Sequence, residues 1–397
     1  MIPFNKPYLT GKEMHYMYQA VYSGKISGNG IYTRKCQQFF EKRYGIKKAL
    51  LTTSCTDALE MCALLIDLKP GDEVIVPSYT FVSTALAFVR QGAKIVFADS
   101  RADHPGMAED SLEDLITPRT KAIVPVHYAG VACDMDKIML LANRYNLIVI
   151  EDAAQAIEAT YKGRPLGSIG HLAAFSFHET KNIISGEGGL LAINDERFID
   201  RSEIIWEKGT NRAEFFRGEV NKYEWIDTGS SFLPSDMTAA FLWAQLENME
   251  NIQAKRKAIW NTYHSKLQSW ANYNNIKQPY IPSYADHNAH IYYLCFENLA
   301  QRQGVIEQLK ALDIHAVSHY LSLHSSRYSK DTNHGMGQVL PMSDRYTDCL
   351  LRLPLFYELN KSEQQRIIEA LIKSELWPVS SNGISNRFQK VSVEPKT

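Results

Sequence analysis

From residue 49 to residue 193 the chain alternates short apolar runs with longer segments that have helical periodicity. This alternation is typical of β-α-β units and predicts a mostly parallel sheet with helices on both faces. Helices are expected between most of the strands, for example at residues 57–67 and 134–145. Seven strands are expected, at residues 49–52, 73–77, 94–98, 121–126, 147–151, 172–177 and 189–193.

The rhythm changes after residue 194, where a long stretch containing tryptophan precedes a polar helix at about residues 251–270. Further elements are then expected: strands at 290–297 and 314–320, and helices at 301–312 and 362–376. The mixture is typical of a small α+β unit.

This change of rhythm predicts a large domain at residues 1–249 and a smaller C-terminal α+β domain at residues 250–376. Residues 377–397 are rich in Ser, Asn, Pro and Lys and show no periodicity, so we expect a flexible tail there.

The composition is that of a globular protein. Apolar residues make up 45% and charged residues 22% of the 397 positions, which allows a large core. Lys and Arg number 43 against 44 Asp and Glu, so a net charge of -1 provides no broad cationic field. General binding to nucleic acid or to an acidic membrane is therefore not expected.

The chain shows no targeting or membrane signal, because its start lacks a basic apolar leader and no run of 18 apolar residues occurs. We expect a soluble, cytoplasmic protein. The six cysteines are scattered without a C-x-x-C pair, so neither a disulfide framework nor a cysteine zinc site is expected, and we expect no metal.

Ligands of parallel sheets bind beyond the carboxyl ends of the strands, so the loops at those ends are the first candidates for a site. After the first strand, Ser54, Cys55 and Thr56 open directly into a helix. Free backbone N–H groups and hydroxyls at such a helix start could hold a phosphate. Ordinary helix capping is the alternative role for these residues.

An aromatic and an acidic residue follow two further strands. Phe81 could face a planar ligand or pack against the sheet. Asp152 follows the apolar run LIVI and Glu151, and Gln155 lies about one helical turn further on. A carboxylate there is costly unless it is paired, so it indicates either a functional site or a solvated strand end.

Ser176 and Lys181 lie in the segment FSFHETKN, which follows the sixth strand. Lys181 is expected at the ligand edge of the sheet, with Asp152 from the preceding strand across from it. Lysines in loops are mostly solvated, but an amine held in this position suits imine formation with a carbonyl group.

Together these residues provide a phosphate cup, an aromatic face, an acid for a protonated ring nitrogen and an amine for an imine. The combination predicts pyridoxal 5'-phosphate (PLP) as the cofactor. Asp152 would keep the pyridine nitrogen protonated, and Lys181 would carry the cofactor and move a proton. A non-catalytic PLP protein and a nicotinamide-dependent oxidoreductase stay open as alternatives.

Longer motifs point to a family. The segments PSYTFVSTA, VHYAG, EDAAQA, FSFHETKN and GEGG, with TTSCT, EKGTNR and FFRGEV, resemble those of the sugar-nucleotide aminotransferases of PLP fold type I. The resemblance covers about residues 1–375. It implies an α/β fold with a mostly parallel seven-stranded sheet flanked by helices, and a smaller C-terminal α+β domain.

The resemblance also implies roles for single residues. Lys181 would bind the cofactor covalently, Asp152 would pair with the pyridine nitrogen, and Gln155 would lie near the phenolic oxygen. Phe81 would stack on the ring. The phosphate would be held by Ser54, Cys55, Thr56 and Ser176.

Members of the family complete the cofactor site across a homodimer interface, commonly with the Asn of a Gly-Tyr-Asn segment. This chain has Gly229-Ser230-Ser231 there, and Ser231 is shorter but could still donate a hydrogen bond. The segment VSHYLSLH matches a family segment near the substrate, so Tyr320 and His324 are candidates for sugar contact. Packing between domains is their alternative role.

The resemblance implies that the substrates are L-glutamate and a dTDP-linked keto sugar aminated at C4, in the synthesis of a surface polysaccharide. Amination at C3, or of a GDP-linked sugar, stays open. Related dehydratases carry His where this chain has Lys181. A free amine is needed to take the cofactor back after each half-reaction, so the lysine favours transamination.

Overall fold

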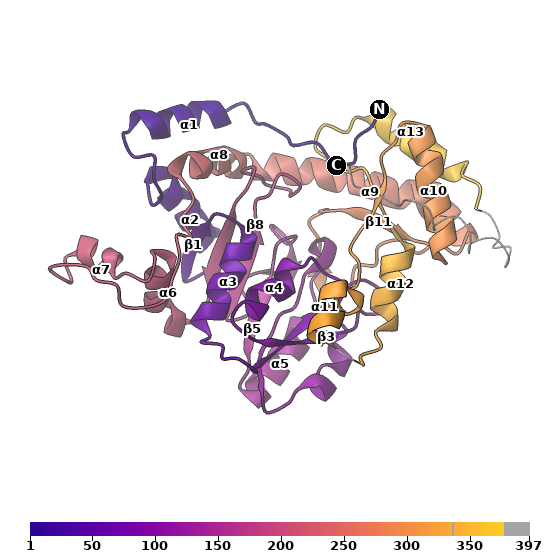
Figure 1. Cartoon of the computed structure of the whole chain (residues 1–397). Coiled ribbons are helices and arrows are strands. Elements are labelled where there is room, and N and C mark those ends of the chain that lie inside the picture. The colour runs from indigo at the N-terminus through magenta and orange to yellow at the C-terminus, as the bar shows by residue number, and fades with distance from the viewer. Residues whose placement is uncertain (336, 377–397) are drawn as a thin grey trace, which may run out of the picture.

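The seven apolar runs form one sheet in the computed structural model, which describes residues 1–335 and 337–376 (Figure 1). The strand order is β1-β9-β8-β5-β4-β2-β3. β9 runs antiparallel to both of its neighbours, and all other adjacent pairs are parallel. The predicted mostly parallel sheet is therefore confirmed. Its strands are β1 (Lys48–Thr52), β2 (Glu73–Pro77), β3 (Lys94–Ala98), β4 (Thr120–Ile123), β5 (Ile148–Asp152), β8 (Leu172–Ser176) and β9 (Gly189–Ile193).

The strand predicted at residues 121–126 ends earlier in the structure. Residues 122–126 are apolar, but β4 ends at Ile123. Pro125 has no backbone N–H to donate to a ladder, and beyond it Val126 only bridges Asp152.

Helices cover both faces of the sheet because successive strand residues point to opposite sides. Leu51 packs with the helices on one face and Leu50 with the helices on the other. The first face carries α2 (Ile31–Tyr44), α5 (Met135–Tyr145) and α8 (Asp236–Glu247), with α1 (Glu13–Tyr22) packed on α8. The second face carries α3 (Cys55–Leu65), α4 (Ser83–Val89) and α6 (Ile199–Trp206), and α7 (Arg212–Arg217) follows α6.

A second sheet, of order β11-β13-β12, forms in the C-terminal part with its own apolar cluster. The predicted elements there are present, but β12 has only two residues and the last helix ends at Ile372. The strands are β11 (Tyr292–Cys295), β12 (Val317–Ser318) and β13 (Leu350–Leu353). The helices are α9 (Met249–Tyr273), α10 (Leu299–Ala311), α11 (Arg327–Thr332), α12 (Pro341–Cys349) and α13 (Lys361–Ile372).

A third, small sheet consists of two-residue strands that the sequence did not predict. It has the order β10-β6-β7. Runs this short have no readable periodicity. They are β6 (Thr160–Tyr161), β7 (Arg164–Pro165) and β10 (Ala285–Asp286). The division at residue 250 stays a prediction, and the predicted tail at 377–397 lies outside the described residues.

The first residues of the chain pack with the C-terminal part (Figure 1). Ile2 is buried in the apolar cluster of the second sheet and bridges Ile314. Three residues later, the Asn5 amide donates to the Glu179 carbonyl oxygen, 3.3 Å away, in the loop between β8 and β9. The N-terminal segment therefore crosses from the C-terminal cluster to the main sheet.

The end of β5 is fixed by the fully buried carboxylate of Glu151. It accepts hydrogen bonds from His127 Nε2 (2.9 Å) and from the backbone N–H groups of Gly167 (2.8 Å), Ile169 (2.7 Å) and Gly170 (2.6 Å). Burial acts to raise the pKa of Glu151, but these hydrogen bonds and the charge of His127 hold the pKa below its ordinary value. The carboxylate is therefore ionised and holds the strand end that carries Asp152.

We expect Glu151→Gln to lower the free energy of unfolding by roughly 2–5 kcal/mol, because an amide NH₂ would face buried donors. Urea unfolding measures the change. The depressed pKa adds stability that is complete above the ordinary pKa of a glutamate and is lost as the pH falls through the folded pKa. Glu113→Gln is the control, since that side chain is 45% exposed. Equal unfolding midpoints for the wild type and Glu151→Gln would contradict the assignment.

Candidate active site

A cavity of about 830 Å³ opens where the carboxyl ends of the parallel strands meet the start of β9. Sheet register brings its walls together: Gly189 pairs with both Thr52 and Ser176, and Asp152 pairs with Ala174. Nine of the eleven residues predicted for the site line this one cavity: Ser54, Cys55, Thr56, Phe81, Asp152, Gln155, Ser176, Lys181 and Tyr320.

The N-terminus of α3 forms one end of the cavity. Ser54 caps this helix by accepting a hydrogen bond from the Asp57 N–H, 3.1 Å away. The first N–H groups of a helix have no partner within the helix, and its dipole favours an anion. A Cβ on Gly189 would lie 2.4 Å from the backbone of Ser54 and Cys55, so only glycine allows β9 to start this close.

Hydroxyl and thiol groups surround this helix start. Thr56 Oγ1 lies 2.7 Å from Ser83 Oγ, and Ser176 Oγ accepts from the His178 N–H at 3.4 Å. Burial, with the nearby charge of Asp152, raises the pKa of Cys55 well above its ordinary value, so the thiol stays protonated. The group is a set of neutral donors of the kind that holds a phosphate.

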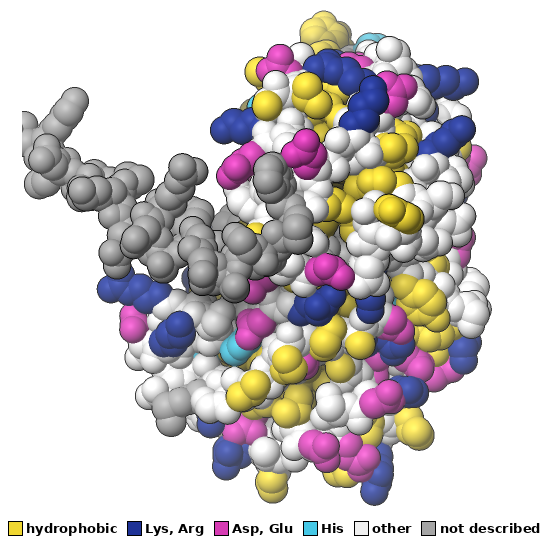
Figure 2. Space-filling view, turned by 90° about the vertical axis from the view of Figure 1, so that its right-hand side faces the viewer, with side chains coloured by type: hydrophobic (Ala, Val, Ile, Leu, Met, Phe, Trp, Pro, Cys, Tyr) yellow, Lys and Arg dark blue, Asp and Glu magenta, His cyan; other side chains and the backbone are white. Residues whose placement is uncertain are grey.

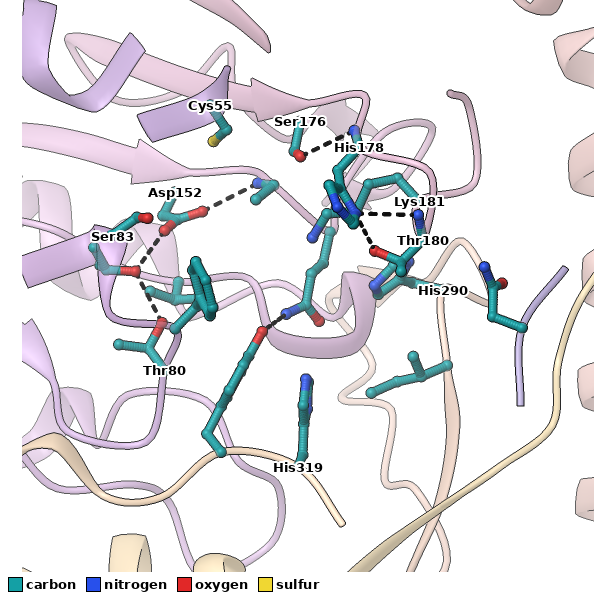
Figure 3. A pocket seen from close by; sticks show the side chains of 18 of the residues that line it. Cys55, Thr80, Ser83, Asp152, Ser176, His178, Thr180, Lys181, His290 and His319 are labelled. Atoms are coloured by element: carbon teal, nitrogen blue, oxygen red, sulfur yellow. Dashed lines mark hydrogen bonds between the residues drawn. The ribbon is translucent and has the colours of Figure 1, made fainter. Parts of the chain in front are cut away.

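The carboxylate of Asp152 is buried at the end of β5 (Figure 3). Its Oδ2 accepts from Thr84 Oγ1 at 2.7 Å and its Oδ1 from the Ala154 N–H at 3.1 Å. No Lys, Arg or His within residues 1–335 and 337–376 forms an ion pair with it. A buried carboxylate without a cation is suited to receive one from a ligand.

Lys181 lies in the loop between β8 and β9, half-buried, and its side chain lines the cavity opposite Asp152 (Figure 3). Burial lowers the pKa of Lys181, and the charge of Arg352 acts in the same direction, against Cys55 and Asp152. A lower pKa leaves more of the amine neutral at a given pH, which is the form that attacks a carbonyl.

Gln155 and a group of aromatic rings form another wall. Gln155 accepts from the Ala129 N–H (2.7 Å) and donates to the Tyr320 hydroxyl (3.1 Å). The ring of Phe81 is 57% exposed and lies 6.2 Å from that of Tyr320, on which His319 stacks at 3.6 Å. An exposed ring at a cavity mouth can stack on a planar ligand.

His290 is a cavity residue that the sequence did not indicate as part of the site. The Asn182 amide donates to the backbone oxygen of Asn288 (2.9 Å) and to Gln253 Oε1 (3.0 Å), so its oxygen accepts from His290 Nδ1–H (2.8 Å). Nε2 is then left as a hydrogen-bond acceptor. Burial, with the charge of Lys181, lowers the pKa of His290 well below its ordinary value, so the ring is neutral.

Other cavity residues come from segments far away in the chain. Phe4 and Asn5 belong to the N-terminal segment, Arg256 to α9 and Arg352 to β13. Single residues such as Arg352 in an apolar strand or Phe4 near the start of the chain have no spacing that marks them as functional, so only the fold reveals them. Further cavity residues do lie in the quoted motifs, among them Thr80, Ser83 and Thr84 in PSYTFVSTA and His178 and Thr180 in FSFHETKN.

Two predicted site residues lie outside this cavity. His324 Nδ1 is 2.7 Å from Ser78 Oγ, and its Nε2 is 3.6 Å from an Asp344 carboxylate oxygen. Ser231 is exposed and forms an isolated β-bridge with Glu207, the residue that follows α6. The role of Ser231 in the site of a second copy of the chain therefore stays a prediction.

The donor set fits PLP, because a phosphate-binding helix start, an unpaired buried carboxylate, an exposed ring and an amine line one cavity. The fold and the site together define the class of PLP-dependent aminotransferases. Residues 7–372 match the model of the DegT/DnrJ/EryC1/StrS aminotransferase family. The chain belongs to this family and is a PLP-dependent sugar aminotransferase.

Individual proteins show the same relationship. The spore coat polysaccharide biosynthesis protein SpsC of Bacillus subtilis is 32% identical, over 93% of this chain and 96% of its own length. DesV of S. venezuelae, solved in complex with a ketimine intermediate, has a TM-score of 0.85 at 29% identity, covering 94% of this chain and 97% of its own. A structure from Streptococcus pneumoniae in its PLP form has a TM-score of 0.84 at 27% identity, covering 93% and 97% of the two chains.

The described part of the chain contains no helix with the length and apolar character needed to cross a bilayer. On the face drawn in Figure 2, Lys and Arg side chains are interspersed with Asp and Glu, and no broad area of one sign is seen. This face agrees with the balanced composition.

Proposed function

We propose that the protein transfers the amino group of L-glutamate to C4 of dTDP-4-keto-6-deoxyglucose. The products are dTDP-4-amino-4,6-dideoxygalactose and 2-oxoglutarate, formed in the cytoplasm for enterobacterial common antigen or another surface polysaccharide. The resemblance of the motifs, above all FHETKN and EKGTNR, supports this choice of sugar. The observation that carries the catalytic part is that Lys181 and Asp152 line one cavity.

In this proposal, PLP would supply an electron sink for the carbon next to the transferred nitrogen. Lys181 would hold the cofactor and, as a free amine, would move the proton at that carbon. Asp152 would keep the ring nitrogen cationic. Gln155 would lie near the phenolic oxygen, and Phe81 would stack on the ring.

The phosphate is assigned to the N-terminus of α3, with Ser54, Cys55, Thr56 and Ser176 around it. This assignment is supported by the close approach of β9 to the helix start. Neutral donors and a helix dipole bind a dianion without an ion pair.

The sugar is assigned to the wall that contains Tyr320, whose hydroxyl already accepts from Gln155. His324 stays a weaker candidate, since its partners are Ser78 and Asp344. We also propose a homodimer in which Ser231 of each subunit completes the other site.

Amination at C3, or of a GDP-linked sugar, is the second candidate function, because the same chemistry serves every keto sugar. The test is to incubate the purified holoenzyme and glutamate with dTDP- and GDP-linked 3-keto and 4-keto sugars. We expect turnover with the dTDP-linked 4-keto sugar, at least 100-fold faster than with the others. NMR of the product then assigns C4 and the galacto configuration, and a C3 amine or a gluco product would contradict the proposal.

A further inference from the structure

The guanidinium of Arg352 lies in the cavity without a carboxylate partner. Arg352 is in the middle of β13, where its neighbours Leu351 and Leu353 are buried in the apolar cluster. Because side chains alternate along a strand, Arg352 points to the other face, and it lines the cavity with Lys181. No Asp or Glu of residues 1–335 and 337–376 forms an ion pair with it.

The hydrogen bonds of this guanidinium are also incomplete. Nη2 donates to the Ser318 carbonyl oxygen at 3.3 Å, whereas Nε is buried without a partner. The charge lies over the ring of Phe4, 4.6 Å from its centroid. A buried charged donor that is left unpaired is costly, and burial lowers the pKa of Arg352 as expected from this cost.

Two other arginines of the chain show how such a group is normally satisfied. Arg256 also lines the cavity, but it donates to the carbonyl oxygens of Ala289 (3.3 Å) and His290 (2.6 Å) and so holds the backbone. Arg101 is partly buried and pairs with Asp103 and Glu109. Arg352 has no carboxylate partner and only the one long hydrogen bond to the Ser318 carbonyl oxygen.

The charged residues that line the cavity also indicate that Arg352 lacks a partner within the chain. Lys181, Arg256 and Arg352 supply positive charge, and Asp152 and the exposed Glu187 are the carboxylates that line the described cavity. Asp152 is already assigned to the ring nitrogen of the cofactor. An oxyanion brought by a substrate would therefore find Arg352 as its unpaired partner.

We propose that Arg352 is the receptor for a substrate oxyanion, which the planar guanidinium binds through its free N–H groups. The inference rests on the proposed function, whose two substrates both carry such groups. The oxyanion is either a carboxylate of the amino donor or the diphosphate of the nucleotide sugar, and the arms of the test distinguish these sources.

The test measures binding of two unreactive probes, glutarate and dTDP, to the holoenzyme by titration calorimetry. Arg352→Met keeps an unbranched apolar stem and removes the guanidinium and its charge. We expect the affinity for one probe to fall about 10- to 100-fold, as for loss of a charged hydrogen-bonded pair. Loss for glutarate alone identifies the donor carboxylate, and loss for dTDP alone identifies the diphosphate.

Arg366→Met is the matched control, since Arg366 is exposed on α13 and donates to the Leu312 carbonyl oxygen. Unchanged affinity for both probes in Arg352→Met would overturn the proposal. A fall in the thermal midpoint with unchanged affinities would show that Arg352 only packs against Phe4. If Arg352→Met does not fold, Arg352→Lys replaces it in the test. Lysine keeps the positive charge but lacks the planar guanidinium, so this variant should bind the probe more weakly than the wild type.

Failure of the inference and failure of the proposed function are distinguishable. The probes report on anion binding even if no keto sugar is aminated. Conversely, turnover by the wild type with no effect of Arg352→Met would leave the function intact and remove the role of Arg352.

Discussion

Multiple-turnover transamination is expected to fall by about 10³-fold or more in Lys181→Ala. The substitution removes both the amine that binds the cofactor and the group that moves the proton, and proton transfer alone is worth about 10²- to 10⁴-fold. The fold should persist, because the hydrogen bond that Lys181 makes within its loop comes from its backbone N–H to the His178 carbonyl oxygen. Steady-state assays with glutamate, alongside circular dichroism, measure the two effects.

Lys266→Ala is the control for this variant, because Lys266 is exposed on α9 and does not line the cavity. Borohydride reduction of the wild-type holoenzyme followed by peptide mapping should place the pyridoxyl label on Lys181. A label on another lysine, or near-normal turnover by Lys181→Ala, would refute the assignment.

The second large effect is expected for Asp152→Asn, with turnover reduced about 10²- to 10⁴-fold. A neutral amide cannot keep a pyridine nitrogen cationic, so the electron sink is lost. The variant should fold, because the amide can still accept from the Ala154 N–H and can donate to the Thr84 hydroxyl. Single-turnover reaction with glutamate, followed by the absorbance of the cofactor, measures the loss.

Asp110→Asn provides the comparison, since the Asp110 side chain is 82% exposed and pairs with Lys137. It should react like the wild type. A rate for Asp152→Asn within a few-fold of that control would show that another group supplies the charge.

The main sheet could be predicted from the sequence because its strands are buried on both faces. Runs such as residues 74–77 are then apolar at every position, and all five residues of β2 are buried. The two-residue strands could not be predicted, because their pairing depends on contacts such as that between Tyr161 and Ala285, far apart in the chain.

The candidate site divides in the same way. Residues such as Asp152 and Lys181 follow directly from strand ends, and a sheet brings its strand ends together. Arg352, His290 and Phe4 reach the cavity only because the C-terminal part folds against the sheet. The local sequence pattern does not indicate that contact, so these residues could be assigned to the cavity only from the three-dimensional structure.

The anchoring of Ile2 has a consequence for how the cavity is made during synthesis. The Ile2 backbone oxygen accepts a hydrogen bond from the His315 N–H at 3.0 Å. This hydrogen bond can form only after residue 315, which is translated much later than Ile2, has been added to the chain. Proteins emerge from the ribosome with the N-terminus first. A nascent chain can therefore build the main sheet early, but Phe4 takes its place in the wall only after the segment that contains His315 has been translated.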